Sequence, residues 1–271
     1  MKKIYSDFTT LYEDNSKTEQ DFQVFLEKNT FLIPRKFLEH HGIYLETLYT
    51  KVPMGNDYIS DFMIITKNSA NWTCIHIEIE DPRKKIFTKE GLPTAEYNSA
   101  RTQVKTWEAW FKNPTNQINF KQFISKVLLS NMRDNPISHK FILIYGRQKE
   151  IKNDRLIALW EKEKNSDNDF YVMTWDSLFE TEYNILNLAK FTDKKIHFIN
   201  CPNLIEGQLF ISGLNPCDFE IPANTVKQMT EKIIEEEKKL DENICNSPFN
   251  KELTKKTLDA ISEIARFEKD N

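Results

Sequence analysis

The chain has 271 residues, of which 39% are hydrophobic and 12% aromatic, so it has enough apolar material for a packed core and is not a disordered protein. Its net charge of −4 excludes a globally basic, nonspecific nucleic-acid coat, although it does not exclude a local basic groove. Its six glycines form no G-x-G-x-x-G or G-K-[ST] motif, which excludes the usual phosphate and dinucleotide loops.

Nothing in the sequence indicates export or insertion into a membrane. The N-terminus lacks an apolar signal core, and no apolar run approaches the roughly 18 residues of a membrane span. The four cysteines are scattered without a C-x-x-C pair, as is typical of reduced structural thiols. We expect a soluble, cytoplasmic protein with no membrane partner.

The first predicted element is a helix that begins at a capping-box pattern, Thr18-Glu-Gln-Asp21, with apolar residues at helical spacing from Phe22 to Leu26. Glu19 lies on the same stripe. It can be a first-turn carboxylate favoured by the helix dipole or a functional acid, and the spacing does not choose between them. A second, short helix is predicted over residues 34–41.

Three strands follow, separated by short turns, which predicts an antiparallel meander. They cover residues 43–52, 58–65 and 72–80.

The second and third of these strands carry three acidic residues. Side chains alternate between the two faces of a strand, so Glu78 and Glu80 share one face while the intervening isoleucines line the other. Asp61 lies on the preceding strand, which is apolar nearly all round. Carboxylates are almost never buried unless they are paired or bind a cation. These acids therefore indicate a cation site.

Basic residues leave the sheet at the same end as the acids, after Pro82. A charge run is usually a solvated loop, but beside a metal site it suits a phosphate backbone, which needs Lys or Arg next to the ion. The predicted DNA-binding residues are Arg83, Lys84, Lys85 and Lys89.

A strongly amphipathic helix is predicted over residues 94–111, where apolar residues recur at four-three-four spacing from Ala100 to Phe111. Gln103 falls on that stripe. A buried glutamine is most often a satisfied core amide, and it is also suited to orient a water or a phosphate.

The remaining elements alternate between helix and strand, which predicts a βαβ unit and a partly parallel sheet. We expect a helix over 120–129, a strand over 140–146, a helix over 151–164, a strand over 170–174, a helix from Asp176 toward Ala189, and an edge strand over 196–199.

The character of the chain changes beyond residue 200. A turn-rich segment over 202–222 precedes two charged helices, 223–240 and 251–267, whose narrow apolar seams suit a helical hairpin or an oligomer contact. We therefore expect an α/β domain over 1–200 and a C-terminal extension over 201–271.

Clustered carboxylates favour Mg²⁺ or Mn²⁺, because hard oxygen ligands suit these ions and substrate phosphates complete their coordination. Beside lysines, such a site suggests phosphodiester hydrolysis. A transition-metal site built from Cys74, His76 and Glu78, which share a face, is a further reading, but two-residue strand spacing suits tetrahedral coordination poorly.

An Asp on one strand followed by Glu-x-Glu on the next, framed by helices, resembles the PD-(D/E)xK nuclease superfamily. Further stretches resemble one family within it, the Shedu family of prokaryotic anti-phage defence proteins, and together they cover roughly residues 15–190. The stretches are residues 18–29, Ile-Glu-Ile-Glu-Asp-Pro at 77–82, residues 86–94, Ala100-Arg-Thr-Gln103 with Trp107 and Trp110, Tyr-Gly-Arg at 145–147, and Thr-Trp-Asp-Ser-Leu at 174–178.

The resemblance implies a restriction-endonuclease-like mixed central sheet flanked by helices, here with a C-terminal helical extension. It implies a Mg²⁺-dependent endonuclease, with Mn²⁺ as an alternative ion, that cuts double-stranded phage or plasmid DNA and assembles as a homo-oligomer such as a tetramer. Carried over by position, Asp61 and Glu78 would ligate the metal. Glu80 would take the third motif place, Gln103 the helix glutamine, and Glu19 the first-helix acid.

The chain departs from the superfamily pattern at Glu80, where Lys is more common. A glutamate can serve as an extra ligand or as a base, but it cannot supply positive charge. That role would pass to Lys84, Lys85 or Lys89, or to a second metal ion. The alternative reading is a catalytically weak DNA-binding or sensing module that retains the nuclease fold.

Overall fold

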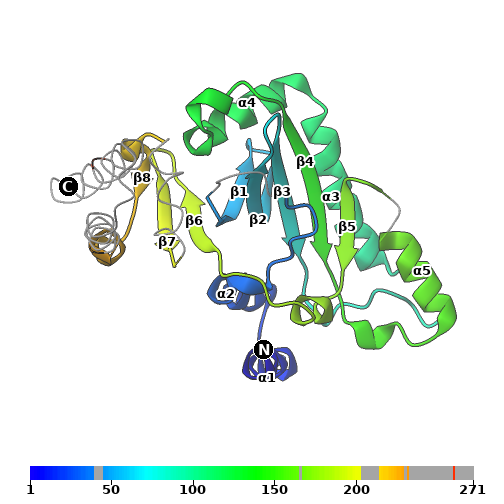
Figure 1. Ribbon diagram of the computed structural model, residues 1–271. Coiled ribbons are helices and arrows are strands. Elements are labelled where there is room, and N and C mark those ends of the chain that lie inside the picture. Colours follow the sequence, from blue (N-terminus) through cyan, green and yellow to red (C-terminus); the bar gives the residue numbers. More distant parts are fainter. Residues whose placement is uncertain (40–44, 165–166, 203–213, 229–230, 232–258, 260–271) are drawn as a thin grey trace, which may run out of the picture.

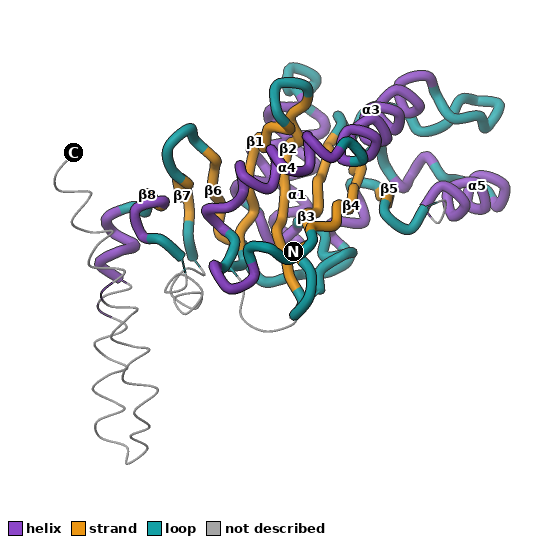
Figure 2. Tube along the Cα trace, turned by 90° about the horizontal axis from the view of Figure 1, so that it is seen from above, coloured by secondary structure: helices purple, strands orange, loops and turns teal. Residues whose placement is uncertain are grey.

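An eight-stranded mixed sheet organises the chain, in the order β5-β4-β3-β2-β1-β6-β7-β8 (Figures 1 and 2). The computed structural model describes residues 1–39, 45–164, 167–202 and 214–228, with 231 and 259. The strands are β1 (Thr47–Met54), β2 (Tyr58–Lys67), β3 (Trp72–Ile79), β4 (Ile137–Ile144), β5 (Phe170–Met173), β6 (Asn187–Phe191), β7 (Ile196–Asn200) and β8 (Phe219–Glu220). The α-helices are α1 (Lys2–Glu13), α2 (Glu19–Lys28), α3 (Ala95–Phe111), α4 (Pro114–Ile124) and α5 (Asp154–Lys164).

The strand directions confirm both topological predictions. β1, β2 and β3 form the antiparallel meander, with Met63 opposite His76 at its centre. β3, β4 and β5 run parallel to one another, as the βαβ pattern requires. The carboxyl ends of these parallel strands therefore lie at one edge of the sheet, where Glu78 ends β3.

Each face of the sheet has its own core. The α3 core packs α3, α4 and α5 against one face and includes Cys74 and Trp107. The α1–α2 core covers the other face and includes Phe22 and Ile77. Figure 1 shows α1 and α2 together on one side of the sheet, apart from α3 and α4. The alternation of side chains predicted for β3 is confirmed, because its even-numbered residues face α3.

Helix α1 was not predicted from the sequence. It forms because its apolar residues meet aromatic side chains from the far end of the domain. The ring of Phe8 stacks on Trp175, with centroids 5.6 Å apart, and also contacts Phe22 and Phe179. The apolar stripe of this N-terminal helix is thus covered by residues more than 160 positions away.

Two predicted helices are wrong. Residues 34–39 of the predicted 34–41 helix form a short turn and irregular backbone, while 40–44 lie outside the described residues. A single 3-10 turn, Thr30–Leu32, replaces it, and the Thr30 hydroxyl is held by the backbone of Leu186 at 2.8 Å. The contact of Thr30 with Leu186 fixes the chain just before the predicted helix, and Pro34 holds Ile33 in extended backbone.

The predicted helix from Asp176 toward Ala189 is also wrong. It stops as a 3-10 turn at Phe179, and the chain then enters β6, which pairs in parallel with β1. Leu188 packs into the α1–α2 core while Ala189 packs into the α3 core, so this segment follows the two-residue period of a strand.

Smaller differences concern boundaries. The helix predicted over 120–129 begins earlier, at Pro114, because Asn113 caps it by accepting a hydrogen bond from the Thr115 N–H at 2.9 Å. Strand β7 is not an edge strand, because β8 pairs with it. The predicted helices 223–240 and 251–267 lie mostly outside the described residues, although 223–228 is helical.

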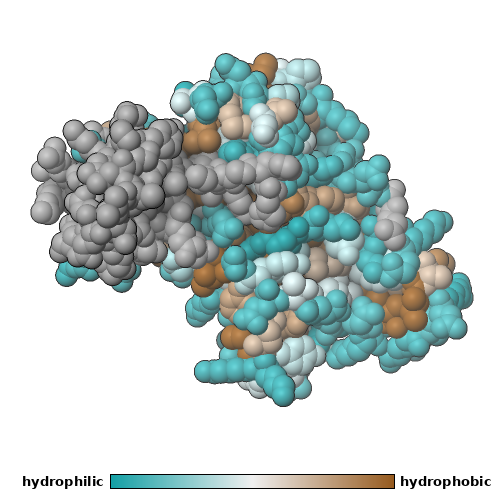
Figure 3. All heavy atoms as spheres, in the orientation of Figure 1, coloured by the Kyte–Doolittle hydropathy of each residue, from teal (hydrophilic) through white to brown (hydrophobic). Residues whose placement is uncertain are grey.

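In the described part of the chain, no helix has both the length and the apolar character of a membrane span. The face shown in Figure 3 is largely hydrophilic, with apolar residues in separate areas. The division at residue 200 stays a prediction, although β8 extends the same sheet beyond it.

Candidate metal centre

Two buried carboxylates face each other across β2 and β3. The register pairs Phe62 with Ile77 and Met63 with His76, which brings Asp61 opposite Glu78 on the face covered by α3. Asp61 is 6% exposed and Glu78 is 8% exposed. The two strongest acidic predictions from the sequence therefore meet at one end of the sheet.

Asp61 is held by one backbone donor and one cation. Its Oδ2 accepts a hydrogen bond from the Ile79 N–H at 2.9 Å. Its Oδ1 lies 2.6 Å from Nζ of Lys51 on β1. Sequence reasoning did not include Lys51 in the site. The signal that could have found it is the meander itself, because the β1–β2 register places Lys51 opposite Asp61.

Glu78 is only half satisfied. Gln103 Nε2 on α3 donates to Oε1 at 2.6 Å, whereas Oε2 is buried and accepts no hydrogen bond from a donor in the described part of the chain; it can share a proton with the carboxyl of Asp61 when one of the two acids is protonated. Burial, followed by the negative charge of Asp61, raises the pKa of Glu78 well above its usual value. A buried, unpaired carboxylate oxygen costs free energy unless something occupies the space beside it.

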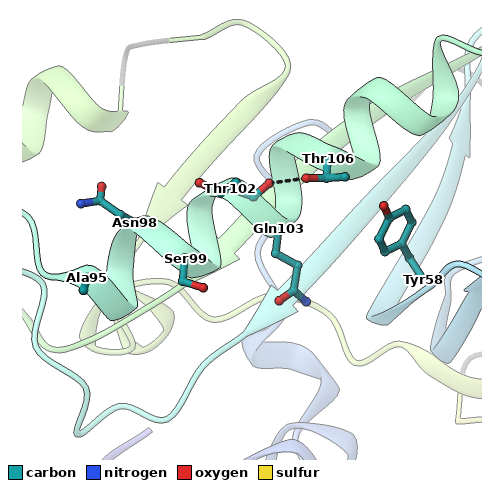
Figure 4. Close-up of a pocket in the computed structure, with 7 residues that line it drawn as sticks. All are labelled: Tyr58, Ala95, Asn98, Ser99, Thr102, Gln103 and Thr106. Atoms are coloured by element: carbon teal, nitrogen blue, oxygen red, sulfur yellow. Dashed lines mark hydrogen bonds between the residues drawn. The ribbon is translucent and has the colours of Figure 1, made fainter.

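Gln103 joins the site as predicted, but not from a buried position. Its side chain is exposed, and it leaves α3 toward the space that Tyr58 of β2 also borders (Figure 4). The apolar stripe of α3 instead consists of its neighbours, such as Val104 and Trp107, which are buried. The amide can therefore contact Glu78 and solvent at once.

Glu80 and Glu19 form a second acidic pair around Lys84. The Glu80 backbone is fixed on both sides, because its N–H donates to Ile144 O at 3.0 Å and its carbonyl accepts from Trp175 Nε1 at 2.8 Å. The Glu80 side chain pairs with Lys84, whose Nζ lies 3.7 Å from Glu19 Oε2. Burial and the charge of Glu80 raise the pKa of Glu19 to about 7.

Helix α2 brings Glu19 to the site. The predicted capping box is confirmed, with Asp21 accepting from the Thr18 N–H at 2.8 Å. One turn further on, buried Gln23 donates to Thr50 of β1 at 3.1 Å, which fixes the helix against the sheet. The first turn of α2 therefore lies beside the end of β3.

The four predicted DNA-binding residues have different surroundings. Arg83 donates to its neighbour Asp81 at 2.8 Å and to the carbonyl of Asp14 at 3.2 Å, so it ties its loop to the α1–α2 connection. Lys84 is engaged with the acids. The side chains of Lys85 and Lys89 are exposed.

The residues present fit a hard divalent ion bound by few protein ligands. Among the described residues, no three His, Cys, Asp or Glu side chains are grouped closely enough to surround a metal. Mg²⁺, however, is commonly held by only one or two carboxylates, with water and substrate phosphates completing its coordination. The unpartnered Oε2 of Glu78 beside Asp61 suits that mode.

The transition-metal reading has less support. His76 is fully buried, and its Nε2 lies 3.1 Å from His139 Nδ1. Burial lowers the pKa of His139 to about 3, and it also holds the pKa of His76 well below its usual value. Both rings pack against Phe111, His139 with centroids 3.6 Å apart. This pair belongs to a neutral aromatic core.

We expect metal binding at this site to depend on pH. Because the pKa of Glu78 is raised and that of Glu19 is about 7, these two carboxyl groups bind more protons in the metal-free folded protein than in the unfolded chain above pH 4.5. Their contribution to the free energy of unfolding therefore declines as pH rises from about 4.5 to 7, whereas the buried neutral His76 and His139 contribute in the opposite direction. A metal must displace these protons, so its affinity rises over the upper part of this range.

The measurement is calorimetric titration of the protein with Mn²⁺ in two buffers of different ionisation enthalpy. Proton release at pH 6 that shrinks by pH 8 is the expected result. Binding without proton release at either pH would contradict the raised pKa values.

Comparison with known proteins gives a family. No curated protein sequence matches the chain. A family model described as "Shedu protein SduA, C-terminal" matches residues 16–179, more than half of the chain. The matched segment holds all four acids of the site, Gln103 and the basic loop. The chain therefore belongs to the Shedu SduA family.

Proposed function

We propose that the chain is a divalent-metal-dependent endonuclease that hydrolyses phosphodiester bonds in double-stranded DNA, with Mg²⁺ as its ion and Mn²⁺ able to replace it. The observation that carries the proposal is the buried, unpartnered Oε2 of Glu78 beside Asp61. Asp61 and Glu78 would hold the ion. When bound, it would polarise the scissile phosphate and lower the pKa of an attacking water.

The remaining site residues have defined tasks in this proposal. Gln103 fixes the Glu78 carboxylate through Oε1 and leaves Oε2 for the ion. Glu80 stands on a rigid backbone, held by Trp175, from which its carboxylate can take a proton from water or add a ligand. Glu19 lies close enough to interact electrostatically with the carboxylate of Glu80 and the ammonium group of Lys84.

An open surface hollow beside Gln103, lined in part by neutral polar side chains, suits a nucleic-acid strand. It has a volume of about 540 Å³ and runs along the outer side of α3 next to Gln103 (Figure 4). Neutral hydrogen-bonding groups can position a sugar-phosphate backbone without adding repulsion. They belong to Tyr58, Asn98, Ser99, Thr102 and Thr106. Lys85 and Lys89 would supply positive charge for the phosphates.

The topology around the site also supports the proposal. One acid lies on β2 and two lie at the carboxyl end of β3, with helices α2 and α3 on either side, in a mixed α/β sheet of the general kind that the proposed restriction-endonuclease-like fold needs. Membership of the Shedu family points to antiviral defence. We therefore propose phage or plasmid DNA as the target, in the cytoplasm, with a homo-oligomer such as a tetramer as the working form.

The proposal is tested by incubating the full chain with supercoiled and linear duplex DNA in Mg²⁺, in Mn²⁺ and in a chelator. We expect cleavage only with an ion. Asp61→Asn keeps the side-chain shape but removes the charge that would bind the ion, so cleavage should fall at least about 100-fold. Circular dichroism and thermal unfolding of the variant serve as the folding control.

A second candidate function rests on the Glu80–Lys84 pair, which neutralises a position where positive charge would favour catalysis. In that case the chain is a DNA-binding or sensing module that has retained the nuclease topology. Binding of duplex DNA that needs no metal, without any nicking of supercoiled DNA by the wild type, would favour this function over the endonuclease.

A further inference from the structure

Lys51 has an unusual backbone for a residue inside a strand. Its φ is +48°, and in the described part of the chain no other non-glycine residue has a positive φ. A side chain at this angle brings its Cβ close to the next carbonyl, so glycine, asparagine and aspartate favour the position far more than lysine does. A strained residue at a candidate site is a reason to ask what its side chain does.

The left-handed residue changes which face of the sheet the strand presents. Before it, even-numbered Leu48 packs into the α1–α2 core. After it, even-numbered Val52 and Met54 pack into the α3 core. The change of phase occurs at Lys51, opposite Asp61. The backbone alone does not need a lysine for this, because glycine or asparagine would accommodate the same φ more easily.

The backbone angle does not explain why this residue is a lysine, so its ammonium group is the feature that needs an explanation. Nζ lies 2.6 Å from Asp61 Oδ1, the oxygen that receives no hydrogen bond from the backbone and is open to a cation, whereas Oδ2 accepts the Ile79 N–H. The Lys51 side chain is 40% exposed, so solvent and a substrate can reach it. An ion and Lys51 would compete for one oxygen atom.

We propose that Lys51 alternates between two anions: it is the counter-ion of Asp61 without metal, and it binds a non-bridging oxygen of the scissile phosphate once the ion occupies Asp61 Oδ1. This inference rests on the proposed nuclease function. It assigns to Lys51 of β1 the positive charge that Glu80 cannot supply at the position where a lysine is more common. Lys84 is a weaker candidate, because it neutralises Glu80 and lies beside Glu19. A fixed cation aimed at developing phosphate charge stabilises the transition state.

The proposal predicts opposite effects on metal and on DNA. Removing the Lys51 charge removes the competitor for Asp61, so metal affinity stays the same or increases. The same change removes a phosphate contact, so DNA binding in the presence of metal and the rate of cleavage both decline. A purely structural lysine would instead lower metal affinity and the thermal unfolding temperature together.

The experiment compares the wild type with Lys51→Asn, which tolerates the left-handed backbone, and Lys51→Arg, which keeps the charge. Lys112→Asn, at an exposed lysine paired with Glu108 on α3, is the matched lysine control. Mn²⁺ affinity is measured by calorimetry, DNA affinity in Ca²⁺ by anisotropy, and cleavage by single-turnover assays in Mn²⁺. We expect Lys51→Asn to bind Mn²⁺ at least as tightly as the wild type, to bind DNA about 10-fold more weakly, and to cleave about 100-fold more slowly.

We expect Lys51→Arg to recover much of the DNA affinity, and Lys112→Asn to leave the Ca²⁺-dependent DNA affinity within about threefold. Weaker Mn²⁺ binding by Lys51→Asn, or DNA affinity equal to that of the wild type, would overturn the role of Lys51. If the wild type binds Mn²⁺ and DNA but never cleaves, the endonuclease proposal fails while the two titrations still decide about Lys51. A wild type that binds no Mn²⁺ overturns both.

Discussion

Replacing Glu78 with glutamine is expected to stabilise the metal-free protein and to abolish cleavage. The raised pKa of Glu78 arises from burial and from the charge of Asp61, so ionisation of Glu78 destabilises the fold without metal. Glutamine has nearly the same shape, removes the charge and can donate a hydrogen bond to Asp61. We expect a gain of about 1–3 kcal/mol in the free energy of unfolding at pH 8, the usual cost of a buried unsatisfied polar group.

The rate of cleavage is expected to fall, because the negative charge of Glu78 that destabilises the metal-free protein is also the charge that would bind the ion. We expect a loss of roughly 1,000-fold or more in the rate, comparable with removal of a main electrostatic contact to a transition state. An increase in stability together with a decrease in rate would identify Glu78 as a functional carboxylate. Replacing a structural carboxylate would lower both the stability and the rate.

The measurement combines chemical denaturation in a chelator at pH 6 and pH 8 with cleavage assays in Mn²⁺. Glu96→Gln is the control, because Glu96 is an exposed acid in the first turn of α3 and should change stability by less than about 1 kcal/mol. The gain for Glu78→Gln should be larger at pH 8 than at pH 6. A loss of stability at pH 8 would show that Glu78 is satisfied by contacts within the protein.

The parts of the fold that the sequence predicted are those with local signals. The two-residue period placed Glu78 on the face opposite the isoleucines of β3, and short turns placed Asp61 on the adjacent antiparallel strand. The capping box at Thr18 depends on four neighbouring residues and was confirmed. Each of these patterns is decided within a few residues of chain, where periodicity and turn chemistry are strong.

The missed parts depend on distant residues. Helix α1 is stabilised by the stacking of Phe8 on Trp175, and β6 is a strand because it pairs with β1, about 140 positions earlier. Lys51 was missed although the predicted meander places it opposite Asp61, and its left-handed backbone has no signal in the sequence. The basic residues after β3 include Arg83, which has a structural role because its guanidinium group donates hydrogen bonds to Asp81 and to the Asp14 carbonyl. Composition alone does not distinguish such residues from free cations.

The second large effect concerns Trp175, the link between the α1–α2 core and Glu80. Its side chain is fully buried, stacks on Phe8 and contacts Phe22. Trp175→Ala would leave a large cavity between α1, α2 and the sheet, and removing a buried tryptophan typically costs about 3–5 kcal/mol. We expect a loss of that size in the free energy of unfolding, measured by chemical denaturation at constant pH and salt.

Trp175→Phe isolates the hydrogen bond from the ring. It keeps most of the stacking on Phe8 but removes the Nε1 donor that fixes the Glu80 carbonyl at 2.8 Å. The loss in stability should be smaller, about 1–2 kcal/mol, since one buried acceptor remains unsatisfied. If the Glu80 backbone positions a working carboxylate, cleavage by the folded Phe variant should decline by more than its stability explains. Unchanged cleavage would show that this hydrogen bond serves the fold alone.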